Sequence, residues 1–128
     1  MRLNCLFIAE TEDKGRGVFT HEKIEANTVI EIAPVIVMSA EDRKLLDQTL
    51  LHDYIFEWGA QQDQCAMGLG WIAVYNHSYK SNSEYFMEFE EGSMFIKTVR
   101  QIEAGEEVTI NYNGPAEDGK KIWFEVKE

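Results

Sequence analysis

The chain has 128 residues and carries 23 acidic residues against 12 lysines and arginines, a formal net charge of -11. This length suits one domain, and the 45% hydrophobic content is typical of a globular protein. The charge argues against direct binding of nucleic acid, because no basic patch is present to neutralise phosphates. It suits a basic partner, although plain solubility explains it equally well. No apolar run approaches the roughly 18 residues of a membrane span.

The N-terminal stretch, residues 3–9, is apolar in part, but three acidic residues follow it closely and no small-residue cleavage site is evident. We interpret it as a first strand and expect an intracellular protein, cytoplasmic or, if the source is eukaryotic, nuclear. Cys5 and Cys65 belong to no C-x-x-C pair, so we expect buried thiols and neither a disulfide nor a zinc site.

Short strands separated by turns account for most of the pattern along the chain. The expected strands are residues 3–10, 18–20, 28–38, 53–58, 84–89, 94–99, 107–112 and, less clearly, 64–74. Pro34 implies a break or an edge position in the third of them. Ser39 and Asp42 have capping-box spacing before leucines at helical intervals, which predicts one helix extending to about Leu50.

Turn residues punctuate these strands. Gly15-Arg16-Gly17 permits turn conformations and close backbone approach, and residues 90–93 predict a β-hairpin. Residues 103–106 predict a second turn, and 113–115 end the last strand. The chain is therefore expected to be mainly β, without internal repeats or linkers.

The stretch from 75 to 82 contains an Asn-His-Ser run, residues 76–78, between two tyrosines. Amide, imidazole and hydroxyl groups beside flat aromatic faces are suited to binding a heteroaromatic ligand. The stretch predicts neither a good strand nor a good helix, and the apolar run 70–74 before it suggests that it emerges from the core. The alternative is a turn whose side chains bond to the local backbone.

Three fragments occur in a fixed order: residues 15–17, 76–78 and 105–112. Together, in a chain of short strands, they resemble the SET-domain protein lysine methyltransferases, over about Gly15 to Tyr112. The resemblance implies a SET-domain fold of small sheets with one or two short helices and a pseudoknot-like C-terminal crossing. It also implies a single SET domain over 1–128, with the core motifs in 15–112 and an aromatic C-terminal segment in 113–128.

The resemblance further implies S-adenosyl-L-methionine as cofactor and S-adenosyl-L-homocysteine as product. The residues that it assigns to cofactor binding are Gly15, Arg16, Gly17, Asn76, His77, Tyr112 and Trp123. Tyr112 and Tyr85 match catalytic tyrosines, the first nearest the transferred methyl group and the second lining the lysine channel. Phe124 joins Trp123 in the segment expected to cover the adenine.

Methyl transfer of this kind requires alignment, exclusion of water and a deprotonated lysine. A free lysine has a pKa of about 10.4, so deprotonation at pH 7 costs about 4 to 5 kcal/mol. Burial beside a sulfonium would lower that pKa. No metal is needed and none is expected. The implied partner is a basic, lysine-containing protein or peptide, and a homodimer that completes the pocket remains open.

Departures from the family pattern keep a second hypothesis open. Ala33 occupies a position where some active members carry a pocket tyrosine, Asn111 stands where many have Asp, and Tyr79 follows Ser78 where a Cys is common. The alternative is therefore a weak or inactive SET-like domain that binds the cofactor or a partner protein. A dinucleotide-binding fold is excluded because Gly15-x-Gly17 lacks a third glycine and a following helix. A serine hydrolase is excluded because no Gly-x-Ser-x-Gly occurs.

Overall fold

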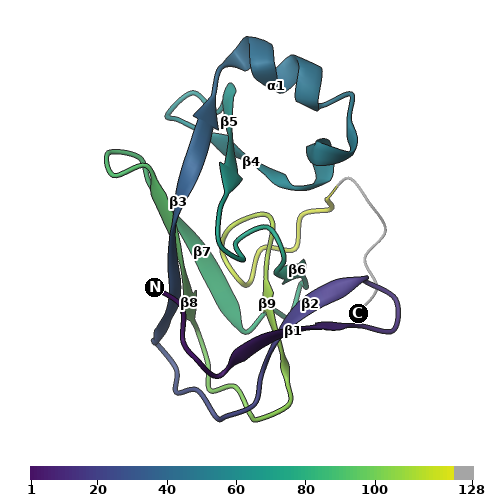
Figure 1. The fold of residues 1–128 in the computed structure, drawn as a ribbon, viewed down its shortest axis with the longest axis vertical. Coiled ribbons are helices and arrows are strands. Elements are labelled where there is room, and N and C mark those ends of the chain that lie inside the picture. The colour runs from purple at the N-terminus through teal and green to yellow at the C-terminus, as the bar shows by residue number, and fades with distance from the viewer. Residues whose placement is uncertain (123–128) are drawn as a thin grey trace.

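The computed structural model describes residues 1–122, which form two β-sheets and two short helices (Figure 1). The four-stranded sheet has the order β1-β2-β9-β6, with bounds Leu6–Glu10, Arg16–Thr20, Glu107–Ile110 and Asn76–His77. The five-stranded sheet has the order β4-β5-β3-β8-β7, with bounds Ile55–Trp58, Gln64–Gly68, Val29–Met38, Ser93–Thr98 and Ser83–Glu88. The expectation of a mainly β fold is confirmed.

The four-stranded sheet brings distant parts of the chain together. Strands β1 and β2 form an antiparallel hairpin whose turn contains Gly15 at φ 72°, a conformation that glycine adopts without strain. Strand β9 pairs antiparallel to β2, and β6 pairs parallel to β9, with His77 opposite Ile110. The expectation that residues 76–78 make a poor strand is therefore wrong for Asn76 and His77, because a partner more than thirty residues away supplies their pairing.

Strand β3 holds the five-stranded sheet together by changing partner at Pro34. From Val29 to Pro34 it pairs with β8, and from Val35 to Met38 it pairs with β5. Proline has no N–H to donate to a ladder, so a change of partner is a position that tolerates it. The predicted hairpin of β7 and β8 is confirmed, with Gly92 in its turn at φ 64°.

The predicted helix begins as expected but ends early. Helix α1 spans Ala40–Leu46, and the hydroxyl of Ser39 accepts a hydrogen bond of 3.1 Å from the backbone N of Asp42. A separate 3-10 helix, η1, spans Leu50–Asp53. Neither helix contains a buried residue, and Leu50 is 74% exposed. The apolar spacing thus does not produce one helix packed on the core.

Strand β5 is shorter than the predicted 64–74, because the chain leaves the sheet after Gly68. The N–H of Leu69 donates to the carbonyl of Pro34, and Gly70 adopts φ 59°, which turns the chain. Residues 69–74 then form turns. This non-strand segment carries the chain from β5 to the Asn-His strand β6.

The hydrophobic core joins the two sheets. Val18, Val108 and Ile110 from the four-stranded sheet and Ile30 and Ile96 from the other are fully or almost fully buried in one cluster. Each such side chain contributes about 1.5–3 kcal/mol of transfer free energy. Both cysteines are buried free thiols. No helix in the part of the chain that the structure describes is long and apolar enough to cross a membrane.

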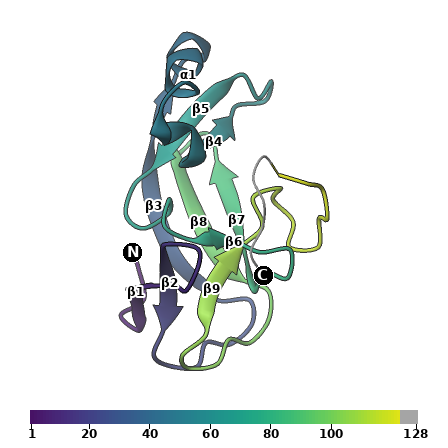
Figure 2. The same ribbon diagram turned by 90° about the vertical axis from the view of Figure 1, so that its right-hand side faces the viewer.

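The segment after β9 returns past the Asn-His strand (Figure 2). The fully buried Asn111 side chain donates from Nδ2 to the carbonyls of Ala116 at 3.3 Å and Asp118 at 2.6 Å. The N–H of Ile122 donates to the Tyr79 hydroxyl at 3.3 Å. The expected meeting of the Asn-His segment with the C-terminal segment is thus present as far as residue 122. Trp123 and Phe124 lie outside the described residues.

Candidate active site

The first part of the site is a cluster of Gly17, Asn76 and Glu107, here called the polar cradle. Asn76 Nδ2 donates to the Arg16 carbonyl at 3.0 Å and to Glu107 Oε2 at 2.8 Å. A Cβ placed on Gly17 would lie 2.5 Å from Glu107 Oε2 and 2.9 Å from Asn76 Nδ2. Strand pairing of β2, β9 and β6 therefore brings the Glu107 and Asn76 side chains into the space that a side chain at position 17 would occupy.

His77 and Tyr112 connect the cradle to the second part of the site. His77 is buried, and its Nδ1 accepts a hydrogen bond of 2.9 Å from the backbone N of Tyr112. This bond assigns the unprotonated nitrogen of a neutral ring to Nδ1. The Tyr79 ring meets the imidazole edge-on at 4.6 Å between centroids, and Lys14 Nζ donates to the His77 carbonyl at 3.2 Å.

The two predicted catalytic tyrosines lie together. The Tyr112 hydroxyl donates to the backbone carbonyl of Tyr75 at 3.0 Å, and the Tyr85 hydroxyl donates to that of Tyr112 at 3.1 Å. Each hydroxyl has given its one proton to a carbonyl, so its oxygen can only accept further hydrogen bonds. The backbone carbonyls of two neighbouring segments therefore orient both phenols.

These tyrosines line a cavity of about 480 Å³ between η1, β4, β7 and the segment after β9. Its aromatic side chains are Tyr54, Phe56, Tyr75, Tyr85, Phe89 and Tyr112, and we call it the aromatic cavity. Its acidic lining residues are Asp47, Asp53 and Glu57, its basic ones are Arg43 and Lys121, and His52 also lines it.

Arg43 forms ion pairs with two acidic residues of this lining. Arg43 Nη2 lies 3.0 Å from Glu57 Oε1, and Arg43 Nε lies 3.9 Å from Asp47 Oδ2. His52 Nδ1 also lies 2.9 Å from Asp47 Oδ1. Arg43 additionally donates to the carbonyls of Gln62 and Gln64, which ties α1 to the β4–β5 hairpin.

Burial keeps the cavity tyrosines protonated. Loss of solvation, with a smaller effect of the Glu57 charge, raises the pKa of Tyr85 to about 12. Burial also raises the pKa of Tyr112 well above its ordinary value, and Tyr54, Asp53 and Glu107 add to the shift. Neither phenol can therefore serve as a general base near neutral pH. They act as neutral hydrogen-bonding walls.

The structure brings most of the predicted site residues together. Gly17 and Asn76 lie in the cradle, Tyr85 and Tyr112 line the cavity, and His77 joins the two through its bond with the backbone N of Tyr112. Arg16 contributes its carbonyl, while Gly15 shapes the turn and has open space beyond its α-carbon. Trp123, also predicted to bind the cofactor, falls outside the described residues.

Ala33 lies in β3 and is buried in the core. It is 4% exposed, and its Cβ lies 3.3 Å from the position of a Cβ built on Gly70. It is not among the described residues that line the aromatic cavity.

Sequence reasoning did not assign Tyr54, Tyr75 or Glu107 to the site. Tyr54 follows a helix that places it beside the cavity, a position that no local pattern signals. Tyr75 directly precedes the Asn-His pair and Glu107 lies within the Gly-Glu-Glu fragment, so adjacency to a motif was the available signal.

Comparison with known proteins identifies the family to which this chain belongs. The family model described as SET domain matches residues 15–113. A relative from Schizosaccharomyces pombe (strain 972 / ATCC 24843), named histone-lysine N-methyltransferase, H3 lysine-37 specific, is 36% identical over 121 residues, which cover 94% of this chain and 77% of the relative. The chain belongs to the SET domain family.

A solved structure supports the fold independently. A Plasmodium falciparum protein described as a "putative histone methyltransferase" superimposes with a TM-score of 0.63 at 24% identity, covering 84% of this chain and 96% of that one. The protein is accordingly a SET-domain lysine methyltransferase, an enzyme class that transfers methyl groups from S-adenosylmethionine to lysine side chains of proteins. The expected fold and enzyme class are confirmed.

Proposed function

We propose that this chain binds S-adenosylmethionine in the polar cradle and methylates a lysine of a basic, histone-like protein segment inserted into the aromatic cavity. The observation that carries the proposal is the junction between the two parts of the site. His77 in β6 accepts a hydrogen bond from Tyr112, which lines the cavity. One strand therefore reaches both the cradle and the wall of the cavity.

The residues of the cradle fit this cofactor. The Glu107 carboxylate and the Asn76 amide complement an ammonium or sulfonium group, and Lys14 and Arg16 can pair with a carboxylate. The absent side chain at Gly17 lets the Glu107 and Asn76 side chains lie directly against its α-carbon, where they can face the cofactor. When bound, the cofactor supplies an electrophilic methyl group. Within the described residues 1–122 no cluster of His, Cys, Asp or Glu could hold a metal ion.

The aromatic cavity fits a lysine side chain. Its rings can enclose the alkyl stem, and desolvation there favours the neutral amine that the reaction needs. The tyrosine oxygens, whose protons are given to backbone carbonyls, accept hydrogen bonds from that amine. Three acidic residues line the cavity against two basic ones, which favours a basic segment over an acidic one.

Binding of S-adenosylhomocysteine by calorimetry is the first test, because it needs no knowledge of the substrate. Asn76→Ala should weaken binding at least tenfold, about 1.4 kcal/mol. Asn4→Ala, a change at an exposed residue, is the matched control and should bind like the native chain. No saturable binding by the native chain at millimolar ligand would refute the cofactor assignment.

Transfer to a histone H3 peptide with labelled S-adenosylmethionine is the second test. The peptide is chosen because the fission-yeast relative is named for histone H3. Labelling should appear with the native chain and require a lysine in the peptide. If the chain binds the cofactor but labels neither this peptide nor a mixture of basic proteins, the proposed substrate class is wrong.

A further inference from the structure

A carboxylate, that of Glu31, lies in the core next to the site. Glu31 on β3 is 1% exposed, and among the described residues 1–122 it is the one acidic side chain in the buried class. Its neighbour Gly70 is held at φ 59°, and a Cβ there would lie 2.4 Å from Glu31 Oε2. The chain thus uses a glycine turn to bring backbone close to this charge.

The Glu31 carboxylate accepts hydrogen bonds from both ends of the segment 71–75. Oε2 accepts a hydrogen bond of 2.8 Å from the backbone N of Trp71, and Oε1 accepts one of 2.8 Å from the hydroxyl of Tyr75. Inside this segment the N–H of Val74 donates to the carbonyl of Trp71. A single side chain on β3 therefore fixes the five residues 71–75 at both ends.

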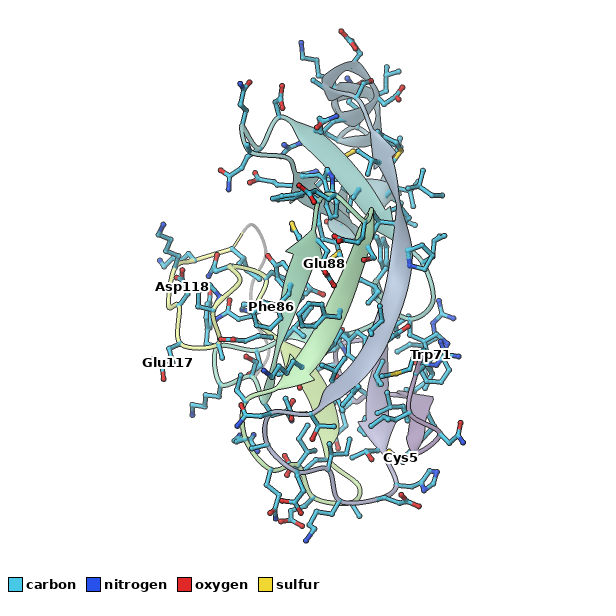
Figure 3. The ribbon with its side chains drawn as sticks, turned by 90° about the vertical axis from the view of Figure 1, so that its left-hand side faces the viewer. Cys5, Trp71, Phe86, Glu88, Glu117 and Asp118 are labelled. Carbon is cyan, nitrogen blue, oxygen red and sulfur yellow. The ribbon has the colours of Figure 1, made fainter. Side chains whose placement is uncertain are left out.

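The Arg2 guanidinium contacts both Glu31 and Trp71. Arg2 Nη1 lies 3.5 Å from Glu31 Oε2, and the Arg2 guanidinium lies 3.8 Å from the centre of the Trp71 ring. Figure 3 shows Trp71 close to β3, on the side away from the loop that carries Glu117 and Asp118. Burial and the charge of Glu31 both raise the pKa of the Tyr75 phenol well above its ordinary value, so Tyr75 remains a donor.

The segment 71–75 is connected to both parts of the site, the cavity and the cradle. The Tyr75 carbonyl that accepts the Tyr112 hydroxyl belongs to the same peptide unit as the backbone N of Asn76. Because a peptide unit is planar and rigid, any movement of Tyr75 displaces the acceptor of Tyr112 and the start of the Asn-His strand together. The position of this one peptide affects the cavity and the cradle at once.

We infer that Glu31 and Tyr75 are positioning residues for methyl transfer, which hold the Tyr75–Asn76 peptide so that Tyr112 and Asn76 are aligned at the same time. This inference rests on the proposed function of the site. A need for packing alone does not account for the pair, because an apolar pair of similar volume fills a core as stably as a buried charge with its partners. A carboxylate instead imposes a defined direction on two donors.

The test compares Tyr75→Phe and Glu31→Gln with Thr98→Val. Thr98 is fully buried, and its hydroxyl donates to the Glu25 carbonyl and accepts from the N of Thr28, away from the cradle and the cavity. Its replacement also removes buried hydrogen bonds, so it controls for a general loss of stability. Thermal unfolding of each variant selects an assay temperature at which all are folded.

Two quantities are then measured: affinity for S-adenosylhomocysteine by calorimetry, and turnover of a histone H3 peptide at saturating S-adenosylmethionine. Tyr75→Phe and Glu31→Gln should each lower affinity at least threefold and turnover at least tenfold, whereas Thr98→Val should change both by less than twofold. In a Tyr112→Phe background, adding Tyr75→Phe should lower turnover by less than threefold, because the hydroxyl that it aligns is already absent.

The outcomes separate this inference from the proposed function. If the native chain neither binds S-adenosylhomocysteine nor methylates the histone H3 peptide, the proposed function fails. If the native chain does both, but Tyr75→Phe matches Thr98→Val in affinity and turnover, the positioning role is overturned. The same holds if its effect is undiminished in the Tyr112→Phe background. If Glu31→Gln fails to fold, Tyr75→Phe alone tests the inference, because it retains the aromatic ring at position 75 and the Glu31 carboxylate.

Discussion

The polar cradle and the outer wall of the aromatic cavity are built differently. Strands β2, β6 and β9 form the cradle, and fully buried residues such as Val18 and Val108 lie beside it in these strands. The outer wall comes from α1 and η1, which contain no buried residue and expose Leu45 and Leu50. Backbone pairing therefore holds the cradle, while side chains on weakly packed elements shape the outer wall of the cavity.

This contrast suggests a division of roles. A site held by strand pairing tolerates little change, because its geometry depends on the core. A wall of short helices can vary without loss of the fold. We expect the cradle to determine whether the enzyme works and the wall to determine which lysine segment it accepts.

The largest expected effect on stability sharpens this contrast. Ile110→Ala removes a fully buried side chain next to the Asn-His strand and should lower the free energy of unfolding by about 2–5 kcal/mol. Leu50→Ala, which truncates a side chain that is 74% exposed, should change it by less than about 0.5 kcal/mol. Urea unfolding of both variants measures the difference. Equal losses would show that α1 and η1 pack as tightly as the sheets.

The next effect concerns the cavity. Tyr112→Phe removes the hydroxyl that donates to the Tyr75 carbonyl and should lower turnover about 100-fold, about 2.7 kcal/mol of activation free energy. Affinity for S-adenosylhomocysteine should fall less than threefold, because the cradle is intact. Single-turnover methylation and calorimetry measure the two quantities. A large loss of affinity with normal turnover would instead assign the Tyr112 hydroxyl to the cofactor side.

A third effect concerns the cradle. Gly17→Ala places a methyl group where the Glu107 and Asn76 side chains now meet, and should weaken S-adenosylhomocysteine binding about 30-fold, about 2 kcal/mol. Stability should change by only about 1 kcal/mol or less, because the Glu107 carboxylate is the end of a flexible side chain that can move aside. Gly119→Ala, at a glycine with open space around it, is the control and should bind normally. Unchanged binding by Gly17→Ala would contradict the cradle.

The last effect, which appears only above pH 10, is a pH dependence of stability. The folded protein keeps the Tyr85 proton up to a pKa of about 12, whereas the unfolded chain releases it near 10. Stability from this group is therefore complete below pH 10 and declines as pH rises toward 12, by about 1.4 kcal/mol per pH unit.

Urea unfolding between pH 8 and 11.5 tests this effect. Tyr85→Phe should decline less steeply above pH 10 than the native chain, while Thr98→Val, which removes no titrating group, should keep the native slope. Parallel curves for Tyr85→Phe and the native chain would show that the phenol is solvated in the folded state.

Local signals in the sequence were sufficient for the elements that depend on neighbouring residues. The Ser39 cap, the hairpin turn at Gly92 and the turn at Gly105 are all present, because a cap or turn is determined by a few adjacent residues. The motif fragments that contain Gly17, Asn76 and Tyr112 likewise indicated the family and most of the site.

Only the tertiary structure decided the remainder. The pairing of Asn76 and His77 with β9, the partner change at Pro34 and the burial of Glu31 each join segments that are distant in sequence. No local pattern encodes such contacts, because their free energy comes from burying both partners at once. For the same reason the apolar spacing around Leu50 predicted a longer helix than the one that formed, since without a surface to pack against the periodicity has little stabilising effect.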